Sequence, residues 1–451
     1  MASASHDATR AASTLRGTKS RTLRVGAMVF LLSVALAALF VGGCGTAPDT
    51  KIVIIGIDGM DWSLADPLIE QGKMPNLARV ISEGTRAELH SLMPLQKSPT
   101  IWTTIATGKG PRKHGIGDFV EGTDEQPLLN STGWRSRSIW DILGESGYTV
   151  GVVGWLVTWP VQEVNGYCVT DRIVYAPEDG YSSIPHLTYP AELDEELAPL
   201  RASHAATTVD DVADLLTGDV WKGGEEAITW GGVQSIRTIC ASDQTIRSIS
   251  EHLLESREQP DFYAVYFLGL DRCCHRFWGA MRPYTVDIKT DERINEAFRN
   301  VIPRYYERVD SLIGDVLDSI DENSTVIVCS DHGFHGPLRT KNGIQLGISM
   351  HRELGLLAAM GPGVRRGSTL ANANVLDLTP TILALLGEPV GRDMDGFVLT
   401  NLIDEDHQAD FPVTYIDTYE RDDEREQSEE AIESALDDAI REELRSLGYI
   451  E

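Results

Sequence analysis

The sequence has few cysteines and no Cys-x-x-Cys pair, which argues against a zinc site built from thiolates. Cys44 lies near the N-terminus, and five cysteines lie in the rest of the chain. Because five is an odd number, these residues cannot all pair with one another, and at least one thiol should stay free. Cys329 lies in an apolar run, so we expect it to be an ordinary buried core residue.

Basic residues are also scarce relative to acidic ones. The chain has 39 Lys and Arg residues against 68 Asp and Glu residues, and its formal net charge is −29. Nucleic-acid binding needs clustered Lys and Arg, so the composition argues against it. The 451 residues, of which 42% are hydrophobic, are enough for one large globular core or two ordinary domains.

The N-terminal residues differ in composition from the rest of the chain. A basic stretch between Arg10 and Arg24 precedes the apolar run "VGAMVFLLSVALAALFVGGC", which ends at Cys44. This order is typical of a signal peptide, and its ending resembles that of bacterial lipoproteins. We expect residues 1–43 to be the signal peptide, residues 44–50 a linker, and a lipid on Cys44 to anchor the protein outside the cytoplasm on a bacterial-type membrane. The alternative is an uncleaved transmembrane anchor, since a bilayer span needs about 20 apolar residues.

Apolar runs that alternate with helical patterns predict the fold. Continuous β-branched runs lie within residues 51–61, 260–271 and 324–333, and each ends in or next to an Asp. Such runs are typical of strands buried in a parallel sheet. Helical patterns occupy residues 75–84, 102–109 and 377–390, and residues 138–155 have the pattern of a helix, a turn and a strand. This alternation predicts a doubly wound, mostly parallel α/β fold.

Two regions depart from the alternation. Residues from about 121 to 259 contain Pro, Gly and acidic clusters, and we expect a cap inserted there into a catalytic domain at 51–403. Residues 404–451 form an acidic tail, in which Leu436, Ile440 and Leu444 recur at helical spacing. We expect the tail to end in an amphipathic helix whose charges face solvent.

Carboxylates follow three of the predicted strands. They are Asp58, Asp271 and Asp331, and His332 follows the last of them directly. In an open α/β sheet, ligands bind beyond the carboxyl ends of the strands, so these side chains should project into one crevice. A single Asp at a strand end is often only a turn residue, but three of them with a neighbouring His favour a binding site.

Two further histidines extend this candidate site. Asp271 and His275 are four residues apart, so a helical turn after the strand would place them on one face. His351 precedes another strand-like run at residues 351–364. Carboxylate and imidazole groups without thiolates suit zinc, and also manganese or iron.

Upstream lies the hydroxyl-rich stretch "QKSPTIWTTIATGKGPRKHGI", residues 96–116. Its five hydroxyl residues are Ser98, Thr100, Thr103, Thr104 and Thr107. A hydroxyl acts as a nucleophile only with an adjacent base, a lowered pKa or a metal. Two metal ions held by the predicted Asp and His residues could activate a serine or a water and hold the oxygens of an in-line phosphoryl displacement.

From about residue 51 to 400 these motifs, in this order, resemble the alkaline phosphatase superfamily, and within it the type I phosphodiesterase/nucleotide pyrophosphatase group. The matching segments are "GIDGMD", "S…TTIATGKGPRKHGI", "GLDRCCH", "SDHGFHG", "HRELGLLAAMGPG" and "DLTPTILALLGEPVGRDMDG". The resemblance implies an alkaline phosphatase-like catalytic domain that hydrolyses phosphate esters with two divalent metal ions, of which zinc is the expected identity and manganese or iron the alternatives.

The resemblance also implies roles for individual residues. One metal would be held by Asp58, the nucleophile, Asp331 and His332, and the other by Asp271, His275 and His351. In the family the nucleophile stands ten residues before the Gly of a Thr-Gly pair; Gly108 therefore indicates Ser98. Thr100 is the alternative, because Pro99 stands one place earlier than the Pro of the usual phosphodiesterase motif.

The sequence departs from the family in three places. Ile101 occupies the position of an Asn that binds a phosphate oxygen in nucleotide pyrophosphatases, so another donor is needed, such as a backbone N–H at the helix start. No counterpart of the phosphate-binding Arg of other alkaline phosphatases is found. The Cys-x-Pro-x-Arg block of sulfatases is absent, which argues against a standard sulfatase.

We therefore expect a membrane-tethered, extracytoplasmic two-metal phosphodiesterase that acts on a phosphate ester or diester through a covalent phosphoserine at Ser98. One alternative is a phosphotransferase or phosphonate hydrolase acting on lipid or glycan head groups. Another is a tethered binding protein without turnover, which has no need of seven metal-site groups. The sequence does not indicate the leaving group or the oligomeric state.

Overall fold

The computed structural model describes residues 48, 50–120, 127–175, 184–202, 206–219, 230–281, 292–335, 339–340, 343–344, 351–421 and 434–450. Residues 1–49 and 50–451 form separate units, and all helices and strands of the described residues belong to the second. The predicted signal peptide and most of the predicted linker lie outside the described residues. Among the residues that are described, no helix combines the length and the apolar character that crossing a membrane requires.

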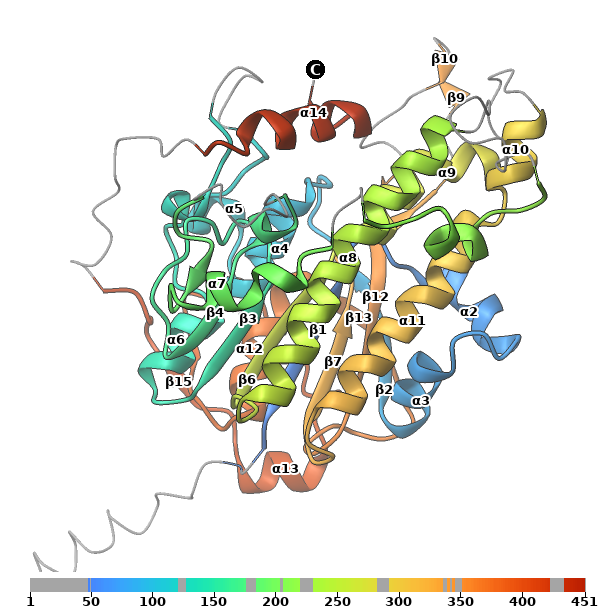
Figure 1. Cartoon of the computed structure of the whole chain (residues 1–451). Coiled ribbons are helices and arrows are strands. Elements are labelled where there is room, and N and C mark those ends of the chain that lie inside the picture. Colours follow the sequence, from blue (N-terminus) through green and yellow to red (C-terminus); the bar gives the residue numbers. More distant parts are fainter. Residues whose placement is uncertain are drawn as a thin grey trace, which may run out of the picture. The chain divides into compact units, whose positions relative to one another are not determined.

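A nine-stranded sheet lies at the centre of the second unit (Figure 1), in the order β13-β2-β12-β7-β1-β6-β3-β4-β5. The strands are β1 (Ile52–Ile57), β2 (Thr85–His90), β3 (Val150–Val153), β4 (Gly166–Val169), β5 (Thr188–Tyr189), β6 (Phe262–Phe267), β7 (Thr325–Cys329), β12 (Leu354–Met360) and β13 (Ser368–Asn374). The run from β7 to β4 is parallel, whereas β12 is antiparallel to both of its neighbours and β5 to β4. The sheet is thus mostly parallel, as predicted.

Helices cover both faces of the sheet. They are α2 (Trp62–Glu70), α3 (Pro75–Glu83), α4 (Ser98–Thr107), α5 (Pro111–His114), α6 (Ile139–Glu145), α7 (Leu193–Leu197), α8 (Trp230–Ser256), α9 (Gly269–Met281), α10 (Glu292–Phe298), α11 (Val301–Ser319), α12 (Leu378–Leu385), α13 (Glu405–Asp410) and α14 (Asp437–Leu447). Short strands form separate pairs: β8 (Gly333–Phe334), β9 (Arg339–Thr340), β10 (Gly343–Ile344), β11 (His351–Arg352), β14 (Val390–Gly391) and β15 (Tyr415–Ile416). Short 3-10 helices also occur, at Ser131–Gly133, Asp171–Tyr175, Ala198–Leu200, Asp210–Leu215 and Val375–Asp377.

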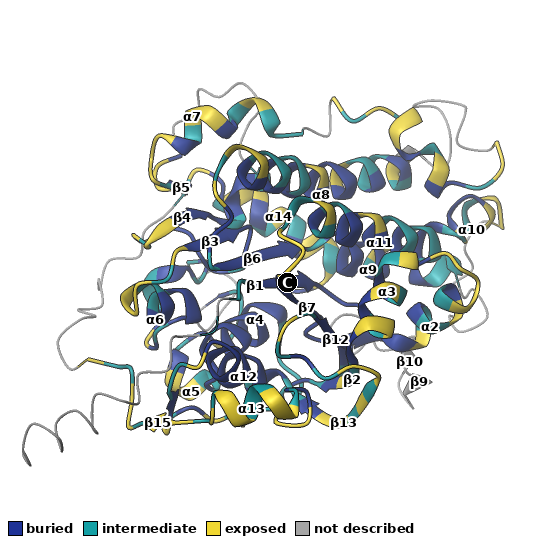
Figure 2. Cartoon of the chain, turned by 90° about the horizontal axis from the view of Figure 1, so that it is seen from below, coloured by how far each residue is buried: buried dark blue, intermediate teal, exposed yellow. Residues whose placement is uncertain are grey.

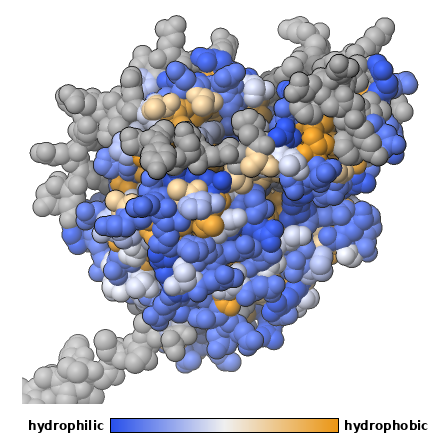
Figure 3. Space-filling view, viewed as in Figure 1, coloured by the Kyte–Doolittle hydropathy of each residue, from blue (hydrophilic) through white to orange (hydrophobic). Residues whose placement is uncertain are grey.

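Alternate residues of β1 belong to two different hydrophobic cores. Val53 and Ile55 pack with residues of α2, α3, α8, α9 and α11, whereas Ile52 and Ile54 pack with residues of α4, α6 and α12. Because successive side chains of a strand point to opposite faces, both faces must be covered, and the strand is buried throughout (Figure 2). The visible surface, by contrast, is largely hydrophilic (Figure 3).

Two predicted boundaries differ from the structure. The helix expected at 102–109 begins earlier, at Ser98, because Pro99 is compatible with the first turn of a helix. The strand expected to run up to Asp271 ends at Phe267, and Asp271 lies in the first turn of α9. The turn at Leu268 therefore separates this carboxylate from the strand.

The region at about 121–259, where a cap is predicted, contains strands of the central sheet. Within it, β3 pairs in parallel with β6, β4 with β3, and β5 with β4, so these strands belong to the central sheet. Both β3 and β4 are four residues long and contain a glycine, which gave them a weak sequence pattern beside the turn-rich segments around them.

The acidic tail predicted at 404–451 does contain a terminal amphipathic helix, α14, with Ile440 and Leu444 buried. Its charges do not all face solvent, however. Asp437 and Glu443 form ion pairs with Arg172 and Arg272, whose side chains are 4% and 7% exposed. The periodicity of the apolar residues identified the helix, but it could not identify which charged residues meet a partner from elsewhere in the chain.

A buried carboxylate on α8 holds the start of α9. Asp243 Oδ1 accepts hydrogen bonds from the N–H groups of Leu268 at 3.2 Å and Gly269 at 3.0 Å, and Tyr305 donates to Oδ2 at 2.7 Å. These bonds satisfy N–H groups at a helix start that would otherwise lack partners. Burial raises the pKa of Asp243 more than these hydrogen bonds lower it, and the pKa is about 6.

We predict that wild type loses stability relative to Asp243→Asn as the pH rises from about 4 to about 6. The pKa of this carboxyl is raised in the folded protein, so the stability it contributes is present below the pKa of the unfolded chain and is lost as the pH rises through the folded pKa. A pKa raised from its ordinary value to about 6 corresponds to about 3 kcal/mol in the free energy of unfolding.

Thermal unfolding of both proteins across this pH range measures the effect. The same substitution at Asp318, an exposed residue of α11, serves as the control. A difference between wild type and Asp243→Asn that stays constant with pH would contradict the prediction.

Candidate active site

The predicted site residues meet beyond the carboxyl ends of three adjacent strands. Because β1 lies between β6 and β7, the segments that follow these strands are neighbours. Asp58 follows β1 directly, Asp271 lies at the start of α9 after β6, and Asp331 and His332 follow β7. His351 lies in β11, which pairs with β8 just after His332. The sheet order thus brings together residues that are far apart in the sequence.

Gly59 allows the segment after β1 to approach the segment after β6 closely. Its φ is +76°, in the left-handed region, and a Cβ there would lie 2.9 Å from Phe334 and 3.2 Å from the Cα of Asp271. Its N–H also donates to Asp331 Oδ1 at 3.3 Å. A glycine at this turn therefore allows Asp58 to lie beside the other carboxylates.

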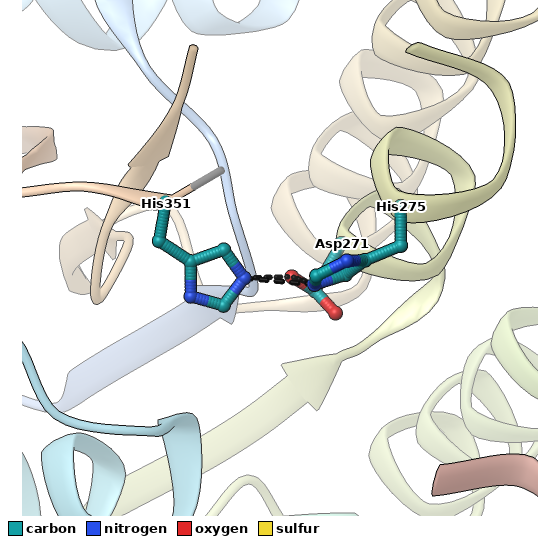
Figure 4. Close-up of side chains that lie close together, drawn as sticks. All are labelled: Asp271, His275 and His351. Atoms are coloured by element: carbon teal, nitrogen blue, oxygen red, sulfur yellow. Dashed lines mark hydrogen bonds and ion pairs between the residues drawn. The ribbon is translucent and has the colours of Figure 1, made fainter. Parts of the chain in front are cut away.

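One group of possible metal ligands consists of Asp271, His275 and His351 (Figure 4), whose ligand atoms lie within 4.8 Å of one another. Asp271 Oδ1 is 3.5 Å from His275 Nε2 and 3.4 Å from His351 Nε2. The two Nε2 atoms are 2.8 Å apart. Asp271 and His275 are one helical turn apart on α9, as the sequence predicted.

A second group surrounds His332. Its Nε2 lies 3.3 Å from Asp58 Oδ1, 3.5 Å from Asp331 Oδ2 and 3.7 Å from Asp271 Oδ1. Asp58, Asp271 and His332 also satisfy the spacing of a possible metal site. Asp271 is therefore common to both groups, whereas the sequence assigned it to one of them.

Of the two candidate nucleophiles, Ser98 is the one beside these ligands. Its Oγ lies 3.3 Å from Asp58 Oδ1 and 3.4 Å from His332 Nε2. Thr100 Oγ1 is buried and makes no hydrogen bond. The later threonines of α4 donate to backbone carbonyls one helical turn earlier: Thr103 to Pro99, Thr104 to Thr100 and Thr107 to Thr103.

The carboxylates give the site a strong preference for positive charge. Burial alone would lower the pKa of His332, but Asp331, Asp58 and Asp271 outweigh it and raise the pKa to about 10. Burial, with Asp58 nearby, raises the pKa of Asp331 well above its usual value. For His351, burial and the neighbouring His332 lower the pKa to about 3, which favours the neutral imidazole that binds metals.

The residues fit divalent metal ions. Asp271 Oδ1 and Asp331 Oδ2 are buried and make no hydrogen bond, although buried polar atoms normally have a partner. Both oxygens face the two groups described above. Oxygen and imidazole ligands without sulfur are the set that zinc, manganese and iron accept.

Two site residues were missed by sequence reasoning, and both are tyrosines. The Tyr266 hydroxyl donates a hydrogen bond to Asp58 Oδ2. Tyr449, near the C-terminus, donates to Asp271 Oδ2 at 2.7 Å. Tyr266 was hidden in an apolar strand, and nothing in the acidic tail indicated that Tyr449 would reach a site residue 178 positions away.

Ile101, at the position of the Asn of nucleotide pyrophosphatases, offers no polar group to the site. Ile101 is fully buried in the hydrophobic core of its sheet face. Backbone N–H groups at the start of α4 are the donors expected in place of the Asn side chain. Those of Thr100 and Ile101 already donate to Lys97 O, at 3.0 and 3.2 Å, and Pro99 has no N–H group.

Comparison with known proteins identifies relatives of this chain. The family model described as "Type I phosphodiesterase / nucleotide pyrophosphatase" matches residues 52–377. No curated protein matches. A solved structure of human ectonucleotide pyrophosphatase/phosphodiesterase 5 is 12% identical, covers 79% of this chain and 100% of its own, and has a TM-score of 0.46. A putative sulfatase from Bacteroides thetaiotaomicron is 13% identical, covers 82% of this chain and 76% of its own, and has a TM-score of 0.47.

We predict that His351→Ala lowers the amount of metal bound per chain from two ions to one. The substitution removes one of three ligands from the group with Asp271 and His275, and two remaining ligands hold a metal weakly. Metal analysis of the purified, dialysed protein measures the ratio. His252→Ala, at a partly exposed histidine that pairs with Glu196, is the matched control. An unchanged metal content in the folded His351 variant would contradict the assignment.

Proposed function

The chain belongs to the type I phosphodiesterase/nucleotide pyrophosphatase family, whose members are metal-dependent phosphate ester hydrolases, and from this membership we propose that it is a two-metal phosphodiesterase that acts through a covalent phosphoserine. The observation that carries the proposal is the environment of Ser98. Its Oγ lies within 3.4 Å of both Asp58 and His332, at the edge of the possible metal ligands. Of the two candidate nucleophiles, Ser98 is the one in contact with these ligands, since Thr100 Oγ1 makes no hydrogen bond.

We assign one ion to Asp58, Ser98, Asp331 and His332, and the other to Asp271, His275 and His351, with zinc as the proposed metal. When bound, the two ions supply Lewis-acid stabilisation of negative charge on the serine and phosphate oxygens. The protein contributes the rigid strand ends and helix starts that hold these side chains.

The proposed reaction has two displacements at phosphorus. Ser98 Oγ forms a bond to phosphorus while the bond to the leaving oxygen breaks, and Asp58 Oδ1, 3.3 Å away, is positioned to accept the serine proton. The leaving oxygen takes a proton from solvent. A water oxygen then forms a bond to phosphorus while the bond to Ser98 Oγ breaks; the water releases a proton to solvent, Ser98 Oγ takes back the proton from Asp58, and a phosphate monoester leaves. Since Ser98 is the first residue of α4, the positive end of this ten-residue helix favours the phosphoryl group there.

We predict that Ser98→Ala lowers the turnover of bis-p-nitrophenyl phosphate by about three orders of magnitude or more, because the variant lacks the atom that bonds to phosphorus. Thr100→Val, which removes the neighbouring buried hydroxyl while keeping the shape of the side chain, is the control and should retain most activity. Intact-mass measurement after acid quenching should detect a phosphorylated wild-type chain and no such species in Ser98→Ala.

Three results would count against the proposal. Full activity in Ser98→Ala with loss in Thr100→Val would assign the nucleophile to Thr100. A higher kcat/KM for p-nitrophenyl phosphate than for the diester would make the protein a monoesterase. A wild-type protein that binds no metal and hydrolyses neither compound would remove the enzymatic function.

We also propose that the enzyme is a lipoprotein held outside the cytoplasm by a lipid on Cys44. In bacterial cells fed an alkyne-bearing fatty acid, wild type and Cys168→Ser should be labelled, and Cys44→Ser should not. Cys168 is a buried free cysteine and serves as the control. A protein that carries no label and keeps residues 1–43 would support the transmembrane anchor instead.

A further inference from the structure

The C-terminal segment, residues 434–450, reaches the candidate active site through Tyr449. It consists of α14, dark red at the top of Figure 1, and the residues on either side of it. Gly448 ends the helix with a φ of +80°, and the N–H of Tyr449 bonds back to Leu444 O at 2.9 Å. This left-handed turn directs the last described residues away from the helix axis, and both Tyr449 and Ile450 are buried.

The Tyr449 hydroxyl lies among all three ligands of one proposed metal. Its Oη donates to Asp271 Oδ2 at 2.7 Å and lies 2.9 Å from His275 Nε2 and 3.4 Å from His351 Nε2. The ring packs against His275, with the ring centres 4.8 Å apart, and against Phe119, at 4.9 Å. The phenol is thus held in place by both its hydroxyl and its ring.

These distances match those between ligands of one metal ion. In a tetrahedral zinc site with bonds of about 2.0–2.1 Å, ligand atoms are about 3.3 Å apart, and a catalytic zinc has three protein ligands and a fourth position for water or substrate. Tyr449 Oη lies 2.9 Å and 3.4 Å from the two imidazole ligand atoms, close to this spacing, and is held there by its bond to Asp271 Oδ2, the carboxylate oxygen that does not face the histidines. It therefore competes for the position that a substrate oxygen needs.

The rest of the segment is held by cations near the nucleophile. Asp437 pairs with Arg172 at 2.7 Å and Glu443 with Arg272 at 2.8 Å. Lys97, which precedes the nucleophile, donates to the backbone oxygen of Tyr449 at 2.9 Å. Cations beside a phosphoryl-transfer site are the groups that bind an anionic substrate, and here they are engaged by the protein itself.

The C-terminal segment also makes apolar contacts beside the nucleophile. Ile440 and Leu444 of α14 line a cavity of about 70 Å³, together with Pro99, Phe119, Leu129 and Leu268. Pro99 follows the nucleophile directly, so this apolar wall adjoins the place of reaction. The C-terminal segment thus presents carboxylates to the cations, aliphatic side chains to the wall and a phenol to the metal ligands.

We propose that the C-terminal segment is an internal inhibitor, in which Tyr449 occupies the fourth position of the Asp271–His275–His351 metal site until a phosphate compound displaces it. The proposal rests on the proposed function, because it assumes that this metal binds a substrate oxygen. Binding of a phosphate compound and release of the segment are then two sides of one equilibrium, so loosening the segment must tighten binding.

Two variants loosen the segment by different means. Tyr449→Phe removes only the hydroxyl and keeps the ring packed against Phe119. The double variant Asp437→Asn/Glu443→Gln removes both ion pairs and leaves Tyr449 intact. Glu442→Gln, at an exposed residue of the same helix, is the matched control.

The probe is inorganic phosphate, and its dissociation constant for the zinc-loaded full-length chain is measured by calorimetry. We expect phosphate to bind about tenfold more tightly to both loosened variants than to wild type, and Glu442→Gln to behave as wild type. Phosphate should also speed trypsin cleavage of wild type after Arg441 and Arg445, because the released helix exposes these bonds.

Equal or weaker phosphate binding by both loosened variants would overturn the proposal, since Tyr449 would then assist binding rather than oppose it. Absence of phosphate binding by every variant would overturn it as well. Turnover of the diester is measured separately: if no variant hydrolyses it while the loosened variants bind phosphate more tightly, the proposed function fails and the internal inhibitor stands.

Discussion

Three carboxylates lie buried beyond neighbouring strand ends, and they repel one another unless positive charge lies between them. This repulsion determines the rest of the site. Asp58, Asp271 and Asp331 are each at most 4% exposed, so water does little to screen their repulsion. They enclose His332 and raise its pKa to about 10. A divalent cation bound here would offset the same charges and contact the buried oxygens that make no hydrogen bond, and its binding would then stabilise the fold.

The sheet makes this arrangement possible. The side chains of β1 alternate between two hydrophobic cores, which fixes the strand between β6 and β7 with helices on both faces. The carboxylates therefore sit on a rigid frame, and the repulsion between them cannot be relieved by separating the strands. Additional support comes from Asp243, which holds the start of α9 and with it two of the proposed metal ligands.

Much of the site could be predicted from the sequence because it depends on local patterns. Apolar runs followed by Asp located Asp58 and Asp331, and the four-residue spacing of Asp271 and His275 placed them on one helix face. The spacing to Gly108 selected Ser98, which lies beside the ligands. The strand-end and helix-face inferences needed only short-range properties of the chain, whereas the choice of Ser98 came from the resemblance to the family.

What the sequence did not reveal depends on contacts between distant segments. The weak patterns of β3 and β4 could not indicate that they extend the main sheet, since pairing with β6 determines it. The tail had the composition of a solvated helix, but Arg172 and Arg272, far away in the sequence, receive two of its carboxylates. No rule based on composition detects a charge that will be matched across the fold.

Asp271 belongs to both groups of ligands, and this has a consequence for how the centre assembles. Its Oδ1 lies 3.4–3.7 Å from His275, His332 and His351, so one carboxylate serves two cation positions. If both groups bound a cation, the first would draw electron density from this oxygen and weaken it as a donor to the second, and the two cations would also repel each other. The second cation would then bind more weakly than the first and exchange more readily.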